Sequence, residues 1–163
     1  TLVDEKLDAI GTPAARDLRG KAAVANAALA YEAYSAMLRG PIWASYAADG
    51  ARSQRPLWAS TSMKDATRPP LEYCEALIAP ATVTTLPPET LAAYRDGGRP
   101  AVRLDDGAIA AAHETVAALD RLGISMEAVA DELERDGVRK FVESWKSLRT
   151  VLERKAAVLA TRA

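Results

Sequence analysis

The 163-residue sequence holds one cysteine, Cys74, and one histidine, His113. A single thiol excludes an intrachain disulfide and a thiolate metal cluster, which fits a reducing compartment, so we expect a cytoplasmic protein. No Cys/His/Asp spacing around His113 is typical of a metal site. We therefore predict no metal, a structural or surface role for His113, and a buried, apolar role for Cys74.

Long hydrophobic runs and an excess of one charge are also missing. No uninterrupted apolar run approaches the roughly 20 residues of a membrane-spanning helix, so no membrane partner is expected. The formal net charge is −1, which gives no reason to expect a nucleic-acid partner. There is no initiator methionine, and we expect the chain to start within a longer protein. The composition, 49% hydrophobic and 26% charged, is ordinary for one globular domain.

Helical patterns cover most of the chain. Thr12 is expected to cap a helix that has Pro13 at its first position and runs to about Arg39 with an alanine-rich face, which another layer can approach closely. Gly123 and Gly137 are expected to end the helices that precede them. The other predicted helices are 3–10, 42–49, 71–78, 88–96, 108–122, 125–136 and 138–161. The apolar residues expected to pack the last two helices are Leu133, Val138, Phe141, Trp145, Leu148 and Leu152.

Two short apolar runs, 55–61 (RPLWAST) and 81–86 (ATVTTL), interrupt the helical pattern and predict strands. Because a helix separates them, they are expected to pair in parallel. Two strands do not complete a parallel sheet, and a (β/α)8 barrel typically needs about 250 residues. We therefore predict an α/β fold, the carboxy-terminal portion of a (β/α)8 barrel. In this interpretation, residues 1–163 belong to a single barrel domain whose amino-terminal strands lie upstream.

Residues 55–65 (RPLWASTSMKD) resemble the phosphate-binding strand and loop of bacterial transaldolases, in which R-P-L-W-A-S-T is followed closely by K-N/D-P. Residues 72–80 (EYCEALIAP) resemble the next helix of that family. Residues 82–91 (TVTTLPPETL) are similar to its T-V-N-T-M-P-E-x-T-L. Residues 18–27 and 137–145 fit the flanking helices. The resemblance therefore covers nearly the whole chain in order.

The resemblance implies a transferase of the pentose phosphate pathway in carbohydrate metabolism, without a cofactor. Such enzymes move a dihydroxyacetone unit from sedoheptulose 7-phosphate to glyceraldehyde 3-phosphate, giving erythrose 4-phosphate and fructose 6-phosphate, through a Schiff base on a barrel lysine. In the family this lysine lies on the fourth strand, catalytic acids lie on the first and third, and a phosphate-binding arginine ends the sixth. All would precede Thr1. This chain would supply strands seven and eight, bind sugar phosphates with the missing amino-terminal half, and be inactive alone.

The lysines agree with this expectation. A Schiff-base lysine needs a water-poor interior that lowers its pKa, so that the free amine can attack. Only Lys64 falls outside the predicted helices, on a loop after a strand, where phosphate contact suits it better than covalent chemistry. We therefore predict no catalytic residue in this chain. The six lysines are Lys6, Lys21, Lys64, Lys140, Lys146 and Lys155.

Four residues at the carboxyl end of the first predicted strand and on the loop that follows are the candidates for binding phosphate. In α/β barrels, phosphate commonly binds at the loops after strands seven and eight. By the resemblance, Ser60 matches the phosphate-binding serine, and Ser62 stands where some members have arginine. Thr61 adds a hydroxyl and Lys64 a positive charge. In the structural alternative, Ser60 and Thr61 only cap the strand end and Lys64 is a solvated charge.

Two other functions remain open. The barrel could be fused to a glucose-6-phosphate isomerase domain in a bifunctional enzyme. Alternatively, the chain could be a non-catalytic, helix-rich interaction protein. We interpret the cations among residues 16–21 as a solvated helix face, and the three tryptophans, Trp43, Trp58 and Trp145, as packing residues.

Overall fold

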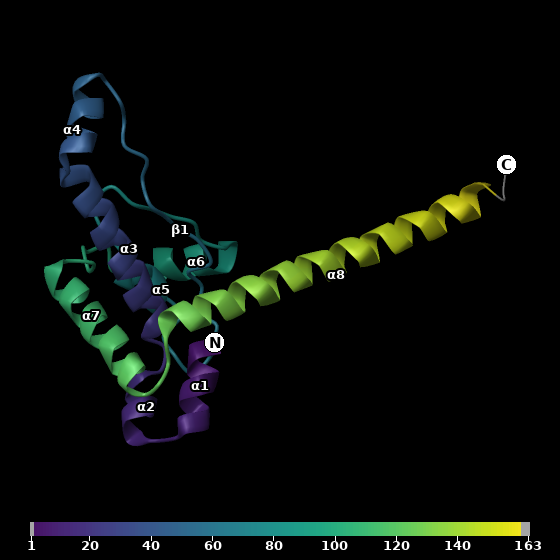
Figure 1. The fold of residues 1–163 in the computed structure, drawn as a ribbon, viewed down its shortest axis with the longest axis horizontal. Coiled ribbons are helices and arrows are strands. Elements are labelled where there is room, and N and C mark those ends of the chain that lie inside the picture. Colours follow the sequence, from purple (N-terminus) through teal and green to yellow (C-terminus); the bar gives the residue numbers. More distant parts are fainter. Residues whose placement is uncertain (1, 161–163) are drawn as a thin grey trace. The chain divides into compact units, whose positions relative to one another are not determined.

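The computed structural model describes residues 2–160, which form two units, residues 2–123 and residues 124–160. The units are described separately. Figure 1 shows the ribbon coloured along the chain. The elements are α1 (Leu2–Ile10), α2 (Pro13–Leu18), α3 (Ala22–Arg39), α4 (Pro41–Ala48), β1 (Leu57–Trp58), α5 (Glu72–Ala76), β2 (Val83–Thr84), α6 (Pro88–Gly97), α7 (Asp106–Arg121) and α8 (Met126–Ala160).

The helix predicted from Thr12 to about Arg39 is interrupted. Thr12 caps α2 as predicted, and its hydroxyl oxygen accepts a hydrogen bond from the backbone N–H of Ala15 at 3.2 Å. Gly20, between α2 and α3, has a φ of +71°. This left-handed backbone suits glycine and does not continue a right-handed helix. The prediction of one long helix is therefore wrong at this glycine.

The core of the first unit forms where α3 lies along α7 (Figure 1). Ala25 and Ala28 of α3 and Ala112 of α7 are buried in one apolar cluster with Leu77 and Leu104. Small alanine side chains let the two helices approach closely, as the alanine-rich face predicted. Trp58 of β1 packs against the same cluster, so this core supports the strand that leads to the candidate site.

The two strands pair in parallel, with Leu57 opposite Val83 and Trp58 opposite Thr84. Helix α5 lies between them in sequence, so the predicted strand–helix–strand order is confirmed. The N–H of Val83 donates to the Pro56 carbonyl at 2.9 Å. The parallel arrangement brings the carboxyl ends of both strands to one edge.

Both strands are shorter than the predicted 55–61 and 81–86. Ser60, just after β1, and Ala81, just before β2, each have a φ of 58°. This left-handed conformation takes the chain out of the extended geometry that a strand needs. The paired segments are therefore two residues long, and the rest of each apolar run is loop.

The predicted helices 125–136 and 138–161 form one continuous helix, α8, as far as the described residues extend (Figure 1). Gly137 lies inside α8, so its predicted role as a C-cap is wrong. The Nζ atom of Lys140 lies 2.6 Å from Oδ2 of Asp136, across the glycine. Pairs of this spacing stabilise a helix by about 0.2–0.5 kcal/mol each, and they offset part of the roughly 0.5–1 kcal/mol that glycine costs in a helix.

The apolar residues of α8 do not pack the two predicted helices against each other, because no turn separates them. Phe141 is 82% exposed and Trp145 is 61% exposed. The prediction of packing roles for these side chains is therefore wrong. The same holds for Leu133, Val138, Leu148 and Leu152, which are also exposed. Among the helices of residues 2–160, none is long and apolar enough to cross a membrane.

Candidate phosphate-binding site

Ser60 lies at the carboxyl end of β1, where the chain leaves the strand in a left-handed conformation. For a residue with a Cβ this conformation costs roughly 1–2 kcal/mol, and strained backbone is often found at binding sites. Ser60 is exposed and lines a hollow of about 320 Å³ with Trp58 and Tyr73. Burial raises the pKa of Tyr73 above its ordinary value, so its phenol stays protonated at neutral pH.

Trp58 also lines the hollow. Its indole Nε1 is buried and has no hydrogen-bond partner among the described residues. Buried donors are nearly always paired with protein or with ordered solvent, so an unpaired one calls for an explanation. The predicted packing role of Trp58 is confirmed by its contact with the core cluster.

Thr61 is buried, and its hydroxyl points toward the second strand. The hydroxyl donates to the backbone carbonyl of Thr85 at 3.3 Å. The N–H of Thr85 in turn donates to the Trp58 carbonyl at 3.0 Å. A threonine hydroxyl has a single hydrogen to donate. In this structure, Thr61 uses that hydrogen to hold the ends of the two strands together.

Ser62 and Lys64 are brought together on the loop that follows. The Nζ atom of Lys64 donates to Oγ of Ser62 at 2.8 Å. The serine accepts this bond, so its own hydroxyl hydrogen remains available for another acceptor, and the ammonium keeps further hydrogens. Lys64 is exposed. The pair can therefore present a hydroxyl and a positive charge to an anion from solvent.

Asp65 closes the loop with a local turn. Its Oδ1 accepts from the N–H of Thr67 at 2.9 Å and from the Thr67 hydroxyl at 2.6 Å. Both bonds favour the ionised carboxyl, and they lower the pKa of Asp65 below its ordinary value. Turns of this kind are typical of aspartate in loops.

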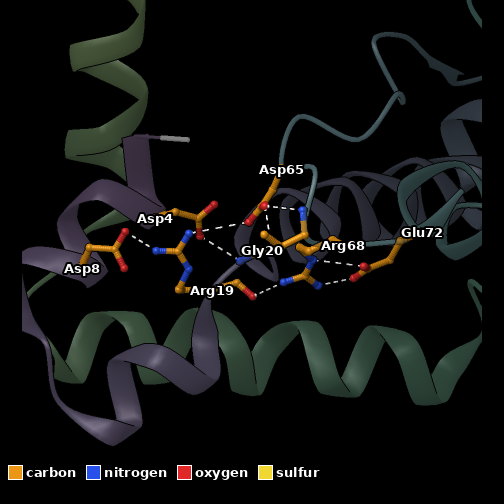
Figure 2. Close-up of polar contacts among 8 residues, drawn as sticks. Asp4, Asp8, Arg19, Gly20, Asp65, Arg68 and Glu72 are labelled. Atoms are coloured by element: carbon orange, nitrogen blue, oxygen red, sulfur yellow. Dashed lines mark hydrogen bonds and ion pairs between the residues drawn. The ribbon is translucent and has the colours of Figure 1, made fainter. Parts of the chain in front are cut away.

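Arg68 ties the end of the loop to the turn between α2 and α3 (Figure 2). Its Nε donates to Oε2 of Glu72 at 3.0 Å, and a second guanidinium nitrogen pairs with Oε1 of the same carboxylate. Its Nη1 donates to the backbone carbonyl of Arg19 at 2.8 Å. The hydrogen bond to Glu72 is the main cause of the raised pKa of Arg68, so the guanidinium stays charged.

Figure 2 also shows Arg19 between two carboxylates from different parts of the chain. Its guanidinium pairs with Asp8 of α1 and lies 3.7 Å from Oδ2 of Asp65. The predicted solvated role of residues 16–21 is therefore wrong for Arg19, whose side chain is 35% exposed. The interpretation missed these contacts because it assigned this segment to a helix face.

The remaining candidate residues lie as predicted. Cys74 is buried, and burial raises the pKa of its thiol. His113 is exposed, and its Nε2 lies 2.8 Å from Oε2 of Glu32. The expected burial of Cys74 and surface position of His113 are confirmed. Within residues 2–160, no three side chains of His, Cys, Asp or Glu gather as a metal-ligand set.

Comparisons with known proteins place these features in a family. The model of the family described as Transaldolase/Fructose-6-phosphate aldolase matches residues 3–152. The chain is 46% identical to a transaldolase of Frankia alni over 153 residues, covering 90% of this chain and 39% of that protein. It is 48% identical to a transaldolase of Parafrankia over 146 residues, covering 90% of this chain and 40% of that protein.

A transaldolase of Acidothermus cellulolyticus is 47% identical over 156 residues, with 94% of this chain and 41% of that protein covered. The chain thus spans about two fifths of the length of the relatives it matches. The predicted fold class is confirmed, since the parallel strand pair and its helices fit part of an α/β barrel. This chain belongs to the transaldolase/fructose-6-phosphate aldolase family.

Proposed function

We propose that this chain forms the phosphate-binding side of a transaldolase. In this proposal, it is the carboxy-terminal part of one barrel domain. The rest of the barrel supplies the lysine that forms a Schiff base with the ketose. The enzyme would transfer a dihydroxyacetone unit from sedoheptulose 7-phosphate to glyceraldehyde 3-phosphate, as part of the pentose phosphate pathway in the cytoplasm. The relatives named transaldolase support this activity.

The observation that carries the proposal is the group of donors after β1. Ser60 is exposed at the strand end, and Ser62 and Lys64 are joined at 2.8 Å on the adjoining loop. Hydroxyl and ammonium donors suit phosphate oxygens.

Thr61 takes a different part in this proposal. Its only donor hydrogen is used on the Thr85 carbonyl. We therefore assign it to holding the two strand ends together, so that Ser60 is presented to the substrate. Direct phosphate contact falls to Ser60, Ser62 and Lys64.

The position of the reactive lysine follows from burial. A Schiff-base lysine needs a water-poor environment. Among residues 2–160 no lysine is buried, and Lys64 is exposed. Reduction of the substrate–enzyme imine with borohydride in the natural full-length protein, followed by peptide mapping, should find the modified lysine outside residues 1–163. A label on Lys64 would overturn this part of the proposal.

Substitution of Ser60 tests the phosphate site. In the natural full-length protein, Ser60→Ala should lower kcat/KM for phosphorylated substrates by about 5- to 150-fold. This corresponds to the roughly 1–3 kcal/mol lost when a charged group loses a hydrogen-bond partner. Ser147→Ala, at an exposed position on α8, is the matched control and should leave kcat/KM unchanged. Unchanged kinetics for Ser60→Ala would remove Ser60 from the site.

A further inference from the structure

We propose that Arg68 is a positioning residue, which fixes the shape of the phosphate-binding loop by locking it against Gly20. The loop is defined here as residues 61–68. The inference rests on the proposed function of this loop. It concerns the residues that hold the loop in place rather than those that contact phosphate.

The guanidinium of Arg68 is held from two sides. The carboxylate of Glu72 accepts hydrogen bonds from two of its nitrogens, one of them at 3.0 Å, in the paired geometry that suits the planar guanidinium group. The backbone carbonyl of Arg19 accepts a third hydrogen bond, from Nη1 of Arg68, at 2.8 Å. The side chain is 26% exposed. Because three of its five N–H donors are engaged and Glu72 offsets its charge, Arg68 is suited to positioning rather than to direct phosphate contact.

Gly20 makes room for this arrangement. A Cβ built on Gly20 would stand 2.9 Å from Nε of Arg68 and closer still to its Cζ and Nη1 atoms. The N–H of Gly20 donates to Oδ1 of Asp4 at 2.8 Å, which ties the turn to α1 (Figure 2). Any side chain at residue 20 would therefore displace Arg68 or the turn itself.

The other end of the loop is also fixed. Thr61 is buried and bonded to the Thr85 carbonyl. Asp65 forms the turn with Thr67 and lies beside Arg19. Residues 62–64, which carry two of the three proposed phosphate donors, Ser62 and Lys64, lie between these anchored points. Holding them in place before the ligand arrives lowers the entropy lost on binding.

The test uses the natural full-length protein and inorganic phosphate as a competitive inhibitor. Gly20→Ala should raise the inhibition constant of phosphate about tenfold. It should raise KM for a phosphorylated aldose by a similar factor, while kcat and the KM for the unphosphorylated aldose stay close to their original values. Residue 20 carries no donor side chain in either form, so this result would come from the shape of the loop.

Gly50→Ala is the matched control. Gly50 has a φ of +87° but no atom within 4 Å of a built Cβ, so the variant carries backbone strain without displacing a neighbour. It should leave phosphate inhibition unchanged. If Gly20→Ala fails to fold, Arg68→Lys gives the answer, because lysine keeps the charge but cannot bridge Glu72 and the Arg19 carbonyl in the same way. It should raise the inhibition constant similarly, whereas Arg149→Lys on α8 should not.

The outcomes separate the two proposals. An unchanged inhibition constant in folded Gly20→Ala, or in Arg68→Lys, overturns the positioning role. If Ser60→Ala and Lys64→Met raise the constant while those variants do not, the phosphate site stands and only this inference fails. If none of the four changes it, the proposed phosphate site fails as well.

Discussion

The hydroxyl of Thr61 donates to the backbone carbonyl of Thr85, 24 residues later in the sequence, at 3.3 Å and so joins the segments that follow the two strands. The parallel ladder between these strands is only two residues long on each side. A single side-chain bond is therefore a large share of the contacts that hold the strand ends in register.

Removing this bond should destabilise the protein. Thr61→Val keeps the shape of the buried side chain but leaves the Thr85 carbonyl without its partner. We expect the free energy of unfolding to fall by about 1–3 kcal/mol, the desolvation penalty of an unsatisfied acceptor. Thr61→Ser, which retains the hydroxyl, should lose less. Urea unfolding followed by circular dichroism measures both, and equal losses would show that the methyl group matters more than the bond.

Ser60 should show a trade-off between stability and binding. Glycine adopts a φ near 58° without the strain of a Cβ. We therefore expect Ser60→Gly to raise the free energy of unfolding by about 1 kcal/mol. The same change removes the hydroxyl and should weaken phosphate inhibition. Denaturation and inhibition measured on one preparation test both effects, and Ser60→Ala should weaken binding without the gain in stability.

Asp65 should titrate below the ordinary range of an aspartate. Its hydrogen bonds from Thr67 lower the pKa of Asp65 in the folded state. The contribution of this turn to the free energy of unfolding is therefore fully present above the pKa that Asp65 has in the unfolded chain, and it is lost as the pH falls through the lower pKa of the folded state. Thr67→Val removes one of the two bonds and should raise the pKa of Asp65 toward its usual value. Carboxyl carbon shifts in an NMR titration measure this directly. Thr115→Val, on α7, should leave the titration of Asp65 unchanged.

Gly137 should be a weak point of α8. Nothing lies within 4 Å of a Cβ built on it, and its backbone is helical. Gly137→Ala is expected to stabilise α8 by about 0.5–1 kcal/mol through lower backbone entropy in the unfolded chain. Hydrogen exchange of the amides on both sides of residue 137 should slow in the variant. Faster exchange there would indicate that the glycine is needed for a local break.

The sequence predicted features that depend on local chemistry. The cap at Thr12 and the burial of Cys74 follow from residue type and immediate neighbours, and the structure confirms them. The parallel strand order followed from apolar runs separated by a helix. These patterns act within a few residues, so a single sequence is enough to predict them.

Features that depend on distant partners were not predicted. The contact between Arg68 and the Arg19 carbonyl joins residues 49 positions apart, and no spacing rule indicates it. Gly20 was placed within a helix because its neighbours suit one, and only its φ shows the break. Conversely, Gly137 resembled a helix end but is accommodated within α8. A glycine alone does not say whether a helix stops or continues.

The position of Gly20 has a practical consequence for protein engineering. A chimera in which residues 61–68 are replaced by those of a relative would gain that relative's loop. It would not gain the turn at residues 19 and 20 against which the arginine of the loop packs. If the host carries a larger residue at position 20, the grafted loop would have nowhere to place its guanidinium. Exchange of this loop between family members should therefore succeed only when residues 19 and 20 are transferred with it.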